Sequence, residues 1–143
     1  MKNVLIILSI ALLTSCASTS QFAKFADKDT PLSTTDARIY ILRPSILGSA
    51  IKMKVFCNDT LVGKTGPLGY LSWDVKEGAY TIKSTSENRD YFNVNAKAGK
   101  TYYIKQRSQW GWLFARVSLK GLDEVEGQEI LSKLKKPTLK YVE

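Results

Sequence analysis

The sequence predicts an all-β domain, an antiparallel β-sandwich with one α-helix near its C-terminal end. From residue 36 onward, short apolar or alternating runs follow one another at roughly ten-residue spacing. Turn residues such as Asn58-Asp59 and Gly66-Pro67 separate these runs. No helical stretch of about 10–15 residues lies between any two of them, which argues against a parallel sheet built from strand–helix–strand units.

The N-terminal residues predict a secretory signal that ends at a cysteine. Val4 to Leu13 form an apolar run of ten residues behind the basic Lys2. This run is too short to span a bilayer, which takes ~20 helical residues, and it suits the apolar part of a signal peptide. Leu13-Thr14-Ser15-Cys16 resembles the bacterial lipobox, in which small residues admit a protease and the cysteine thiol accepts a diacylglycerol. We expect a signal peptide at 1–15 and lipidation of Cys16; the alternative is an uncleaved, buried helix with a core cysteine.

A lipidated Cys16 makes membrane lipid the expected partner of the chain. Two or more acyl chains hold a protein stably at a bilayer, whereas one binds only marginally. An aspartate directly after the lipidated cysteine resembles an inner-membrane retention signal, and this chain has Ala17 at that position. The expected location is therefore the bacterial outer membrane, facing the periplasm. Residues 16–35, rich in Ser and Thr and without alternation, predict a lipidated flexible tether. Within it, Phe22 and Phe25 could share one face of a helical turn or dip toward lipid, but a disordered spacer is the simpler interpretation.

A β-sandwich domain with its C-terminal helix is expected over residues 36–136. In the run 70–75, Leu71, Trp73 and Val75 share one face, while Ser72 and Asp74 lie opposite. We therefore expect Trp73 to be buried. The predicted strands are 37–42, 52–57, 60–65, 70–75, 79–84, 91–96, 101–106 and 115–120.

The helix is expected over residues 123–134. Val125, Ile130, Leu131 and Leu134 have helical spacing. Acidic residues at its start and lysines at its end suit the helix dipole. Gly127 is expected to weaken it by ~1 kcal/mol relative to alanine. Pro137 ends it, which leaves residues 137–143 as a tail.

Two stretches resemble a known family. They are Ala37–Pro44, and Val55–Lys64 leading into Leu71–Ile82. With 101–104 and 117–119, they are similar to the bacterial lipoprotein family of unknown function DUF2846. The segment Gly78-Ala79-Tyr80-Thr81-Ile82 also resembles PEGA-type and carboxypeptidase-regulatory-like sandwiches. The resemblance implies a sandwich of transthyretin-like type and no catalytic residues.

The composition excludes much catalytic chemistry. The chain has no histidine, so it holds no Ser-His-Asp triad, no Cys-His dyad and no His-ligated metal. Two cysteines cannot supply a four-cysteine zinc or iron–sulfur site. We expect no enzyme activity, no metal and no cofactor. Cys57 is expected to be a buried strand cysteine; the alternative is an exposed thiol that pairs between chains.

The net charge of +8 is spread along the sequence. A solvated basic surface is the simplest interpretation, and attraction to anionic lipid or polysaccharide is the functional one. A lipid-anchored, secreted protein rarely meets nucleic acid, so we expect no nucleic-acid partner.

Three large aromatic residues lie within five residues, between two predicted strands. Trp110, Trp112 and Phe114 form the candidate binding surface. Aromatic residues are enriched in the hot spots of interfaces. The candidate partners are an envelope protein, an envelope polysaccharide or lipid. The alternative is structural, with the three rings covering an open end of the core.

These observations predict a membrane-anchored lipoprotein of the bacterial cell envelope with a non-enzymatic, binding or structural role. One alternative is a glycan-binding module that uses Trp110 and Trp112. The other is an uncharacterised hydrolase.

Overall fold

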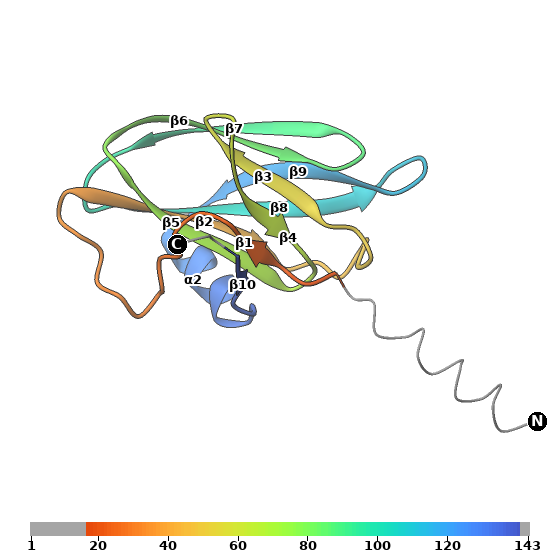
Figure 1. Ribbon diagram of the computed structural model, residues 1–143, viewed down its shortest axis with the longest axis horizontal. Coiled ribbons are helices and arrows are strands. Elements are labelled where there is room, and N and C mark those ends of the chain that lie inside the picture. Colours follow the sequence, from red (N-terminus) through yellow and green to blue (C-terminus); the bar gives the residue numbers. More distant parts are fainter. Residues whose placement is uncertain (1–16, 141–143) are drawn as a thin grey trace, which may run out of the picture.

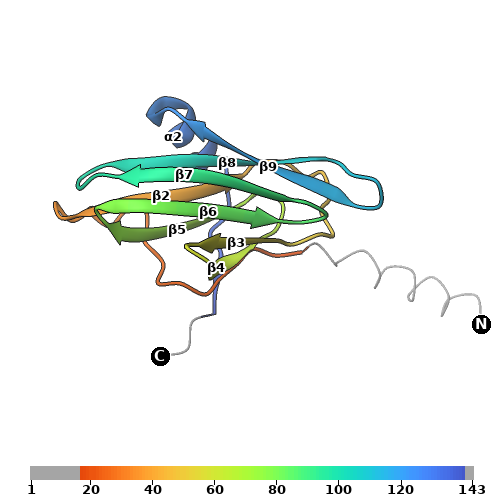
Figure 2. The same ribbon diagram turned by 90° about the horizontal axis from the view of Figure 1, so that it is seen from above.

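Two β-sheets face each other and a short helix covers the outer side of one of them (Figure 1, Figure 2). The computed structural model describes residues 17–140. Within them, the strands are β1 (Ser20–Gln21), β2 (Asp36–Arg43), β3 (Met53–Cys57), β4 (Thr60–Thr65), β5 (Gly69–Lys76), β6 (Gly78–Thr85), β7 (Arg89–Ala96), β8 (Thr101–Trp110), β9 (Ala115–Leu122) and β10 (Thr138–Leu139), and the helix is α2 (Glu124–Ser132). The predicted all-β sandwich with a C-terminal helix is confirmed at this level.

Both sheets are mixed, which corrects the expectation of an antiparallel sandwich. The 6-stranded sheet has the order β10-β1-β4-β3-β6-β7, and the 4-stranded sheet has the order β5-β2-β8-β9. Most neighbours are antiparallel, but β2 pairs with β8 and β1 pairs with β10 in parallel. In both cases the two strands are far apart in sequence, so no hairpin fixes their direction.

The main core lies between the two sheets and is built from alternating residues. Trp73 is 5% exposed and packs in this core with Leu71 and with Ile39 and Ile41 of β2. The predicted burial of Trp73 is thereby confirmed. The sheet registers place Ile39 opposite Trp73, and Ile41 opposite Leu71.

A second core lies on the other face of the 4-stranded sheet, beneath α2. Tyr40 and Leu42 point to this side of β2 and pack with Tyr70, Tyr103 and Leu131. The rings of Tyr40 and Tyr103 stack, with centroids 5.2 Å apart. β2 is therefore buried on both faces.

The helix starts as its sequence predicts. Asp123 is the N-cap, and its side chain accepts a hydrogen bond from the amide of Glu126 at 2.9 Å. Gly127 has a role that its helix propensity does not suggest, since a Cβ at this position would lie 2.2 Å from Cγ of Tyr103. The glycine lets the helix approach the sheet closely.

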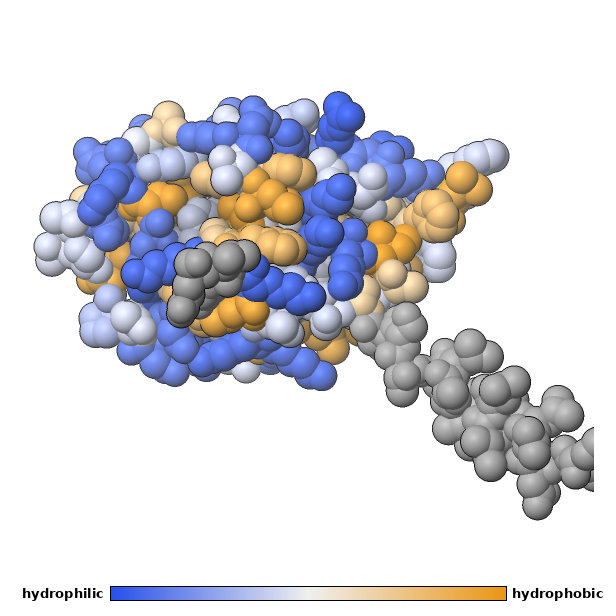
Figure 3. Space-filling view, in the orientation of Figure 1, coloured by the Kyte–Doolittle hydropathy of each residue, from blue (hydrophilic) through white to orange (hydrophobic). Residues whose placement is uncertain are grey.

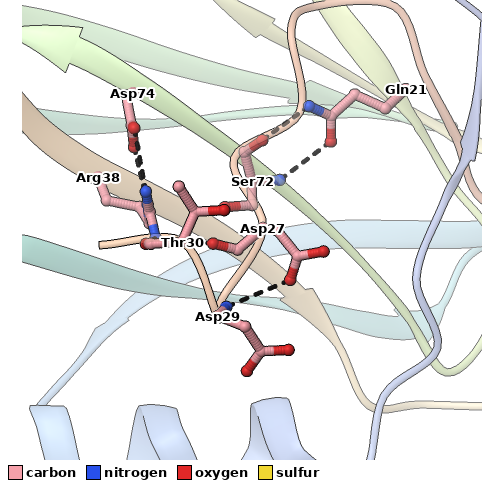
Figure 4. A network of polar contacts seen from close by, with 7 residues as sticks. All are labelled: Gln21, Asp27, Asp29, Thr30, Arg38, Ser72 and Asp74. Carbon is pink, nitrogen blue, oxygen red and sulfur yellow. Dashed lines mark hydrogen bonds and ion pairs between the residues drawn. The ribbon is translucent and has the colours of Figure 1, made fainter. Parts of the chain in front are cut away.

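Residues 17–35 pack on the sandwich, so the prediction of a flexible tether is wrong for much of this segment. Gln21 is fully buried. Its amide nitrogen donates to the carbonyl oxygen of Ser72 at 2.7 Å, and its side-chain oxygen accepts from the amide of Ser72 at 3.0 Å (Figure 4). Ser72, on the face of β5 opposite Trp73, is buried as well.

Arg38 fastens the next part of the same segment (Figure 4). Its guanidinium forms a two-fold ion pair with Asp74, at 2.7 and 3.0 Å. Its remaining terminal nitrogen donates to the carbonyl oxygens of Asp27 and Thr30, at 2.9 and 2.8 Å. One buried side chain thus joins β2 and β5 to the N-terminal segment.

The predicted tail at 137–143 also carries structure in its described part. β10 pairs with β1, and the amide of Lys140 donates to the carbonyl oxygen of Gln21 at 2.7 Å. The domain therefore extends on both sides of the predicted limits, 36–136.

Candidate functional site

The three candidate aromatic residues lie at the tip of the hairpin that joins β8 to β9. Trp110 ends β8 and pairs with Ala115, while Trp112 and Phe114 belong to the connection. Their exposed fractions are 84%, 86% and 62%. The tip projects from one end of the molecule, and Figure 3 shows hydrophobic surface there. The structural alternative, in which these rings cover the core, is wrong.

A carboxylate orders the backbone of this tip. Glu87, in the turn between β6 and β7, accepts hydrogen bonds from three consecutive amides. Its Oε1 accepts from Trp112 and Leu113, both at 3.1 Å, and its Oε2 accepts from Phe114 at 3.3 Å. Hydrogen bonds to an ionised acceptor are stronger than neutral ones. The exposed tip is therefore held in one conformation.

Gly111 is required by this arrangement. Its amide donates to the carbonyl oxygen of Phe114 at 2.8 Å, which closes the turn. A Cβ at Gly111 would lie 1.6 Å from Oε2 of Glu87. Only glycine therefore admits the carboxylate at this position.

The base of the hairpin is fixed to the opposite sheet. The hydroxyl of Ser86 donates to the carbonyl oxygen of Ala115 at 2.6 Å. The side chain of Asn88 donates to the carbonyl oxygen of Val117 and accepts from its amide, at 2.9 and 2.7 Å. The turn between β6 and β7 thus holds the hairpin through the first residues of β9.

A second loop, residues 44–51, lies beside the hairpin and is organised by a buried arginine. Arg43 has no exposed surface. Its terminal nitrogens donate to the carbonyl oxygens of Leu47, Gly48, Ile51 and Thr65, at 2.8–3.3 Å. Burial lowers the pKa of this guanidinium to about 10. It remains charged at neutral pH and binds carbonyl dipoles in place of a carboxylate.

The two loops enclose a shallow groove. Leu47, Gly48 and Ile51 line one side, residues 110–115 line the other, and the volume is about 340 Å³. A Cβ at Gly48 would lie 2.7 Å from that of Ala115, which shows how closely the loop approaches the hairpin. Ile46, in the same loop, is 68% exposed.

The same loop contacts the first described residue of the chain. The amide of Ala17 donates to the carbonyl oxygen of Ser49 at 3.2 Å. In both ribbon views, this end of the described chain and the β8–β9 tip lie at the same end of the molecule (Figure 1, Figure 2). Ala17, Ile46 and Ser49 line a hollow of about 500 Å³ together with Pro67 and Leu68.

Basic side chains lie near the aromatic tip. Lys52 and Lys54 line a hollow with Phe114 and Glu87. Arg116 is exposed at the start of β9, opposite Gln109. Among residues 17–140, none of these three cations forms an ion pair within 4.0 Å.

Of the two cysteines, only Cys57 lies within the described residues. Cys16 lies outside the described residues, so its predicted lipidation stays a prediction. Cys57 is half-buried beside the main core. Burial raises the pKa of its thiol, which disfavours the reactive thiolate.

No helix within residues 17–140 is long and apolar enough to cross a membrane. The family model described as "Protein of unknown function (DUF2846)" matches residues 33–120. The chain belongs to the DUF2846 family. The expected resemblance is thereby confirmed.

An uncharacterized protein of Haemophilus influenzae is similar to this chain. The two are 29% identical over 135 residues, which cover 90% of this chain and 80% of the relative. Within this chain, the match to the DUF2846 model extends from just before β2 into β9. It includes Arg43, Glu87 and the aromatic tip, and it leaves out β1, α2 and β10.

The sequence pattern singled out the aromatic residues of the tip as candidates and did not point to the residues that position them. Glu87 stands in a polar turn, and Arg43 ends a strand. Neither carries a local pattern that distinguishes it from an ordinary surface charge. Their roles depend on backbone groups more than twenty positions away, or on carbonyls that converge only after folding.

Proposed function

We propose that this chain is a membrane-anchored lipoprotein of the bacterial cell envelope with a non-enzymatic, binding or structural role. In this proposal, residues 1–15 are removed as a signal peptide and Cys16 carries the lipid. The domain then faces the periplasm from the outer membrane. The transthyretin-like type of the sandwich belongs to the same proposal.

The observation that carries the proposal is how soon after Cys16 in the sequence the buried residues of the domain begin. The sequence Leu13-Thr14-Ser15-Cys16 resembles a lipobox. Packing begins almost at once after it, because Thr19, Ser20 and Gln21 are already buried. An acyl chain on Cys16 would hold the domain against the bilayer without a spacer.

The glycines of the neighbouring strands support this view of the segment. A Cβ at Gly66 would lie 1.7 Å from the carbonyl oxygen of Ala17. A Cβ at Gly69 would lie 1.8 Å from the hydroxyl of Thr19. The sandwich therefore has space for residues 17–19 only because two side chains are missing. This is what a domain that starts at its anchor requires.

A binding or structural role agrees with the chemistry of the surface. The aromatic tip is exposed yet held in one conformation by Glu87. A preorganised aromatic surface loses little conformational entropy when a partner covers it. The thiol of Cys57 is half-buried and its pKa is raised, which disfavours the reactive thiolate that a cysteine nucleophile needs.

A second candidate function is a glycan-binding module. It is favoured by the exposure of both Trp110 and Trp112, since exposed indole rings can stack on sugar rings. The double variant W110A/W112A separates binding from folding. Lost capture of envelope polysaccharide with unchanged melting is the expected result under this candidate.

The anchor is tested with the two cysteines as matched variants. Cells that express the wild-type chain, Cys16→Ser and Cys57→Ser are grown with labelled palmitate. We expect label on the wild-type chain and on Cys57→Ser, and none on Cys16→Ser. The intact mass of the labelled proteins should show loss of residues 1–15 together with the added lipid. Label retained on Cys16→Ser would contradict the proposal.

A further inference from the structure

Five large hydrophobic side chains share one end of the molecule without a covering partner in the described chain. They are Ile46, Trp110, Trp112, Leu113 and Phe114, here called the aromatic end, and each is more than 60% exposed. Exposed hydrophobic groups of this size mark a surface that is covered in use. The rigid support beneath them argues against a merely loose loop.

The aromatic end lies beside the point where the described chain begins. The amide of Ala17 donates a hydrogen bond to the carbonyl oxygen of Ser49, in the loop that carries Ile46. That loop meets the hairpin at Gly48 and Ala115. Arg43 donates hydrogen bonds to the carbonyl oxygens of Leu47 and Gly48, which fixes the loop beside the hairpin.

We propose that the aromatic end inserts into the headgroup region of the same bilayer that holds the acyl chains of Cys16. This inference depends on the anchored lipoprotein proposed above. The anchor and the aromatic end would then form two contacts of one domain with one membrane. Together they set the orientation of the sandwich on the bilayer.

The chemistry of the aromatic end fits a lipid interface. Tryptophan rings prefer the boundary between headgroups and acyl chains, because one part of the ring is apolar and its N–H remains polar. Leu113 and Phe114 directly follow Trp112 and supply purely apolar side chains. Lys52, Lys54 and Arg116 lie nearby and form no ion pair with any other described residue, and anionic lipids attract such cations.

The backbone of the tip is also suited to a less polar medium. Unpaired amides are costly there. Glu87 already accepts from the amides of Trp112, Leu113 and Phe114, and Gly111 donates to Phe114. The tip therefore brings few unsatisfied amides into the headgroup region.

The three tryptophans allow a direct test. Trp73 is buried in the main core, whereas Trp110 and Trp112 are at the tip. The full-length lipidated protein is placed in vesicles of phosphatidylethanolamine and phosphatidylglycerol, with and without lipid brominated near the headgroups. Variant W73F reports the tip, and variant W110F/W112F reports the core. The difference between wild type and W110F/W112F gives the same information should W73F not fold.

We expect the emission of W73F to be quenched by brominated lipid and protected several-fold from aqueous iodide. The emission of W110F/W112F should respond to neither reagent. Exchange of phosphatidylglycerol for a neutral lipid should weaken the quenching of W73F. The charge-removing variant K52Q/K54Q should lose this dependence on phosphatidylglycerol.

The contrary outcomes distinguish the two proposals. Acylated protein that floats with the vesicles, yet keeps tip tryptophans open to iodide, overturns this inference and leaves the lipoprotein proposal intact. Protection that requires added peptidoglycan or another envelope polymer also overturns it, in favour of a glycan or protein surface. If mass analysis finds no acyl chain on Cys16, both proposals fail.

Discussion

The Oε1 atom of Glu87 accepts a hydrogen bond from the backbone amide of Trp112, so the conformation of the aromatic tip is set by a residue in a turn of the opposite sheet. The ring of Trp112 itself contributes little to this, since it is 86% exposed. Trp112 is thus exposed on one hairpin while a residue of another hairpin fixes its backbone.

Removal of Glu87 is expected to loosen the tip while the sandwich stays folded. In Glu87→Ala, the amides of residues 112–114 lose their acceptor, so their hydrogen exchange should speed up by at least an order of magnitude. Glu87→Gln keeps one acceptor oxygen and should have an intermediate effect. Glu129→Gln, on the exposed face of α2, is the matched control and should leave these amides unchanged. Equal protection in Glu87→Ala and wild type would contradict the role of the carboxylate.

Trp73 and Trp112 should differ sharply in their contribution to stability. Trp73→Ala leaves a large cavity between the sheets and should lower the free energy of unfolding by ~3–5 kcal/mol. Trp112→Ala removes an exposed ring and should change it by less than ~0.5 kcal/mol. Denaturant titration of both variants provides the measurement. A small effect for Trp73→Ala would show that the ring is not in the core.

Gln21 should contribute to stability although it lies in the segment predicted as a tether. Its side chain completes two hydrogen bonds of the Ser72 backbone in a fully buried place. Gln21→Ala leaves the amide of Ser72 unpaired, whereas the carbonyl oxygen of Ser72 keeps the hydrogen bond from the amide of Ala26 at 3.0 Å. One unpaired buried group costs about 1–3 kcal/mol. Gln128→Ala, at an exposed helix position, is the control. If thermal melting shows equal midpoints for the two variants, the segment does not pack as described.

Tyr70 should make the domain sensitive to alkaline pH. Burial raises the pKa of its phenol to about 12, from an ordinary value of 10.0. Above pH 10 the unfolded chain therefore releases this proton first, and stability falls as the pH rises from 10 toward 12. Tyr70→Phe should reduce this slope.

The same variant should cost little stability at neutral pH, because the buried hydroxyl of Tyr70 has no hydrogen-bond partner within residues 17–140. Melting curves at pH 7 and pH 11 provide the measurement. A pH slope as steep as that of the wild type would assign the effect to other phenols.

The longer strands and the helix were predictable because each has a recognisable pattern within its own sequence. β5 and β6 alternate apolar and polar residues, and the turns between strands contain Gly, Asn or Asp. The helix is visible from its N-cap, Asp123, and its apolar spacing. Such signals lie within a few residues of one another.

The elements that were missed depend on distant partners. β1 and β10 have two residues each, which is too short for any alternation. The parallel pairing of β2 with β8 depends on chain direction, which no turn between them records. β2 did give one hint, since its apolar residues continue without alternation from Ile39 to Leu42, as expected for a strand buried on both faces.

At Gly127, helix propensity predicts a weak point in the helix, whereas the structure shows a glycine required by packing. Glycine does weaken an isolated helix by ~1 kcal/mol. In this fold, however, an added Cβ would overlap the ring of Tyr103, and overpacking of this kind costs ~1–3 kcal/mol. The tertiary contact outweighs the propensity.

The pairing of β1 with β10 also has a consequence for the order of folding. Lys136 reaches Asp27 across a separation of 109 residues, and β10 closes the sheet edge next to β1. These contacts form only when the last strand has been synthesised and delivered. Until then, β1 is paired on its β4 side alone, and the edge that β10 covers stays open while the rest of the sandwich assembles.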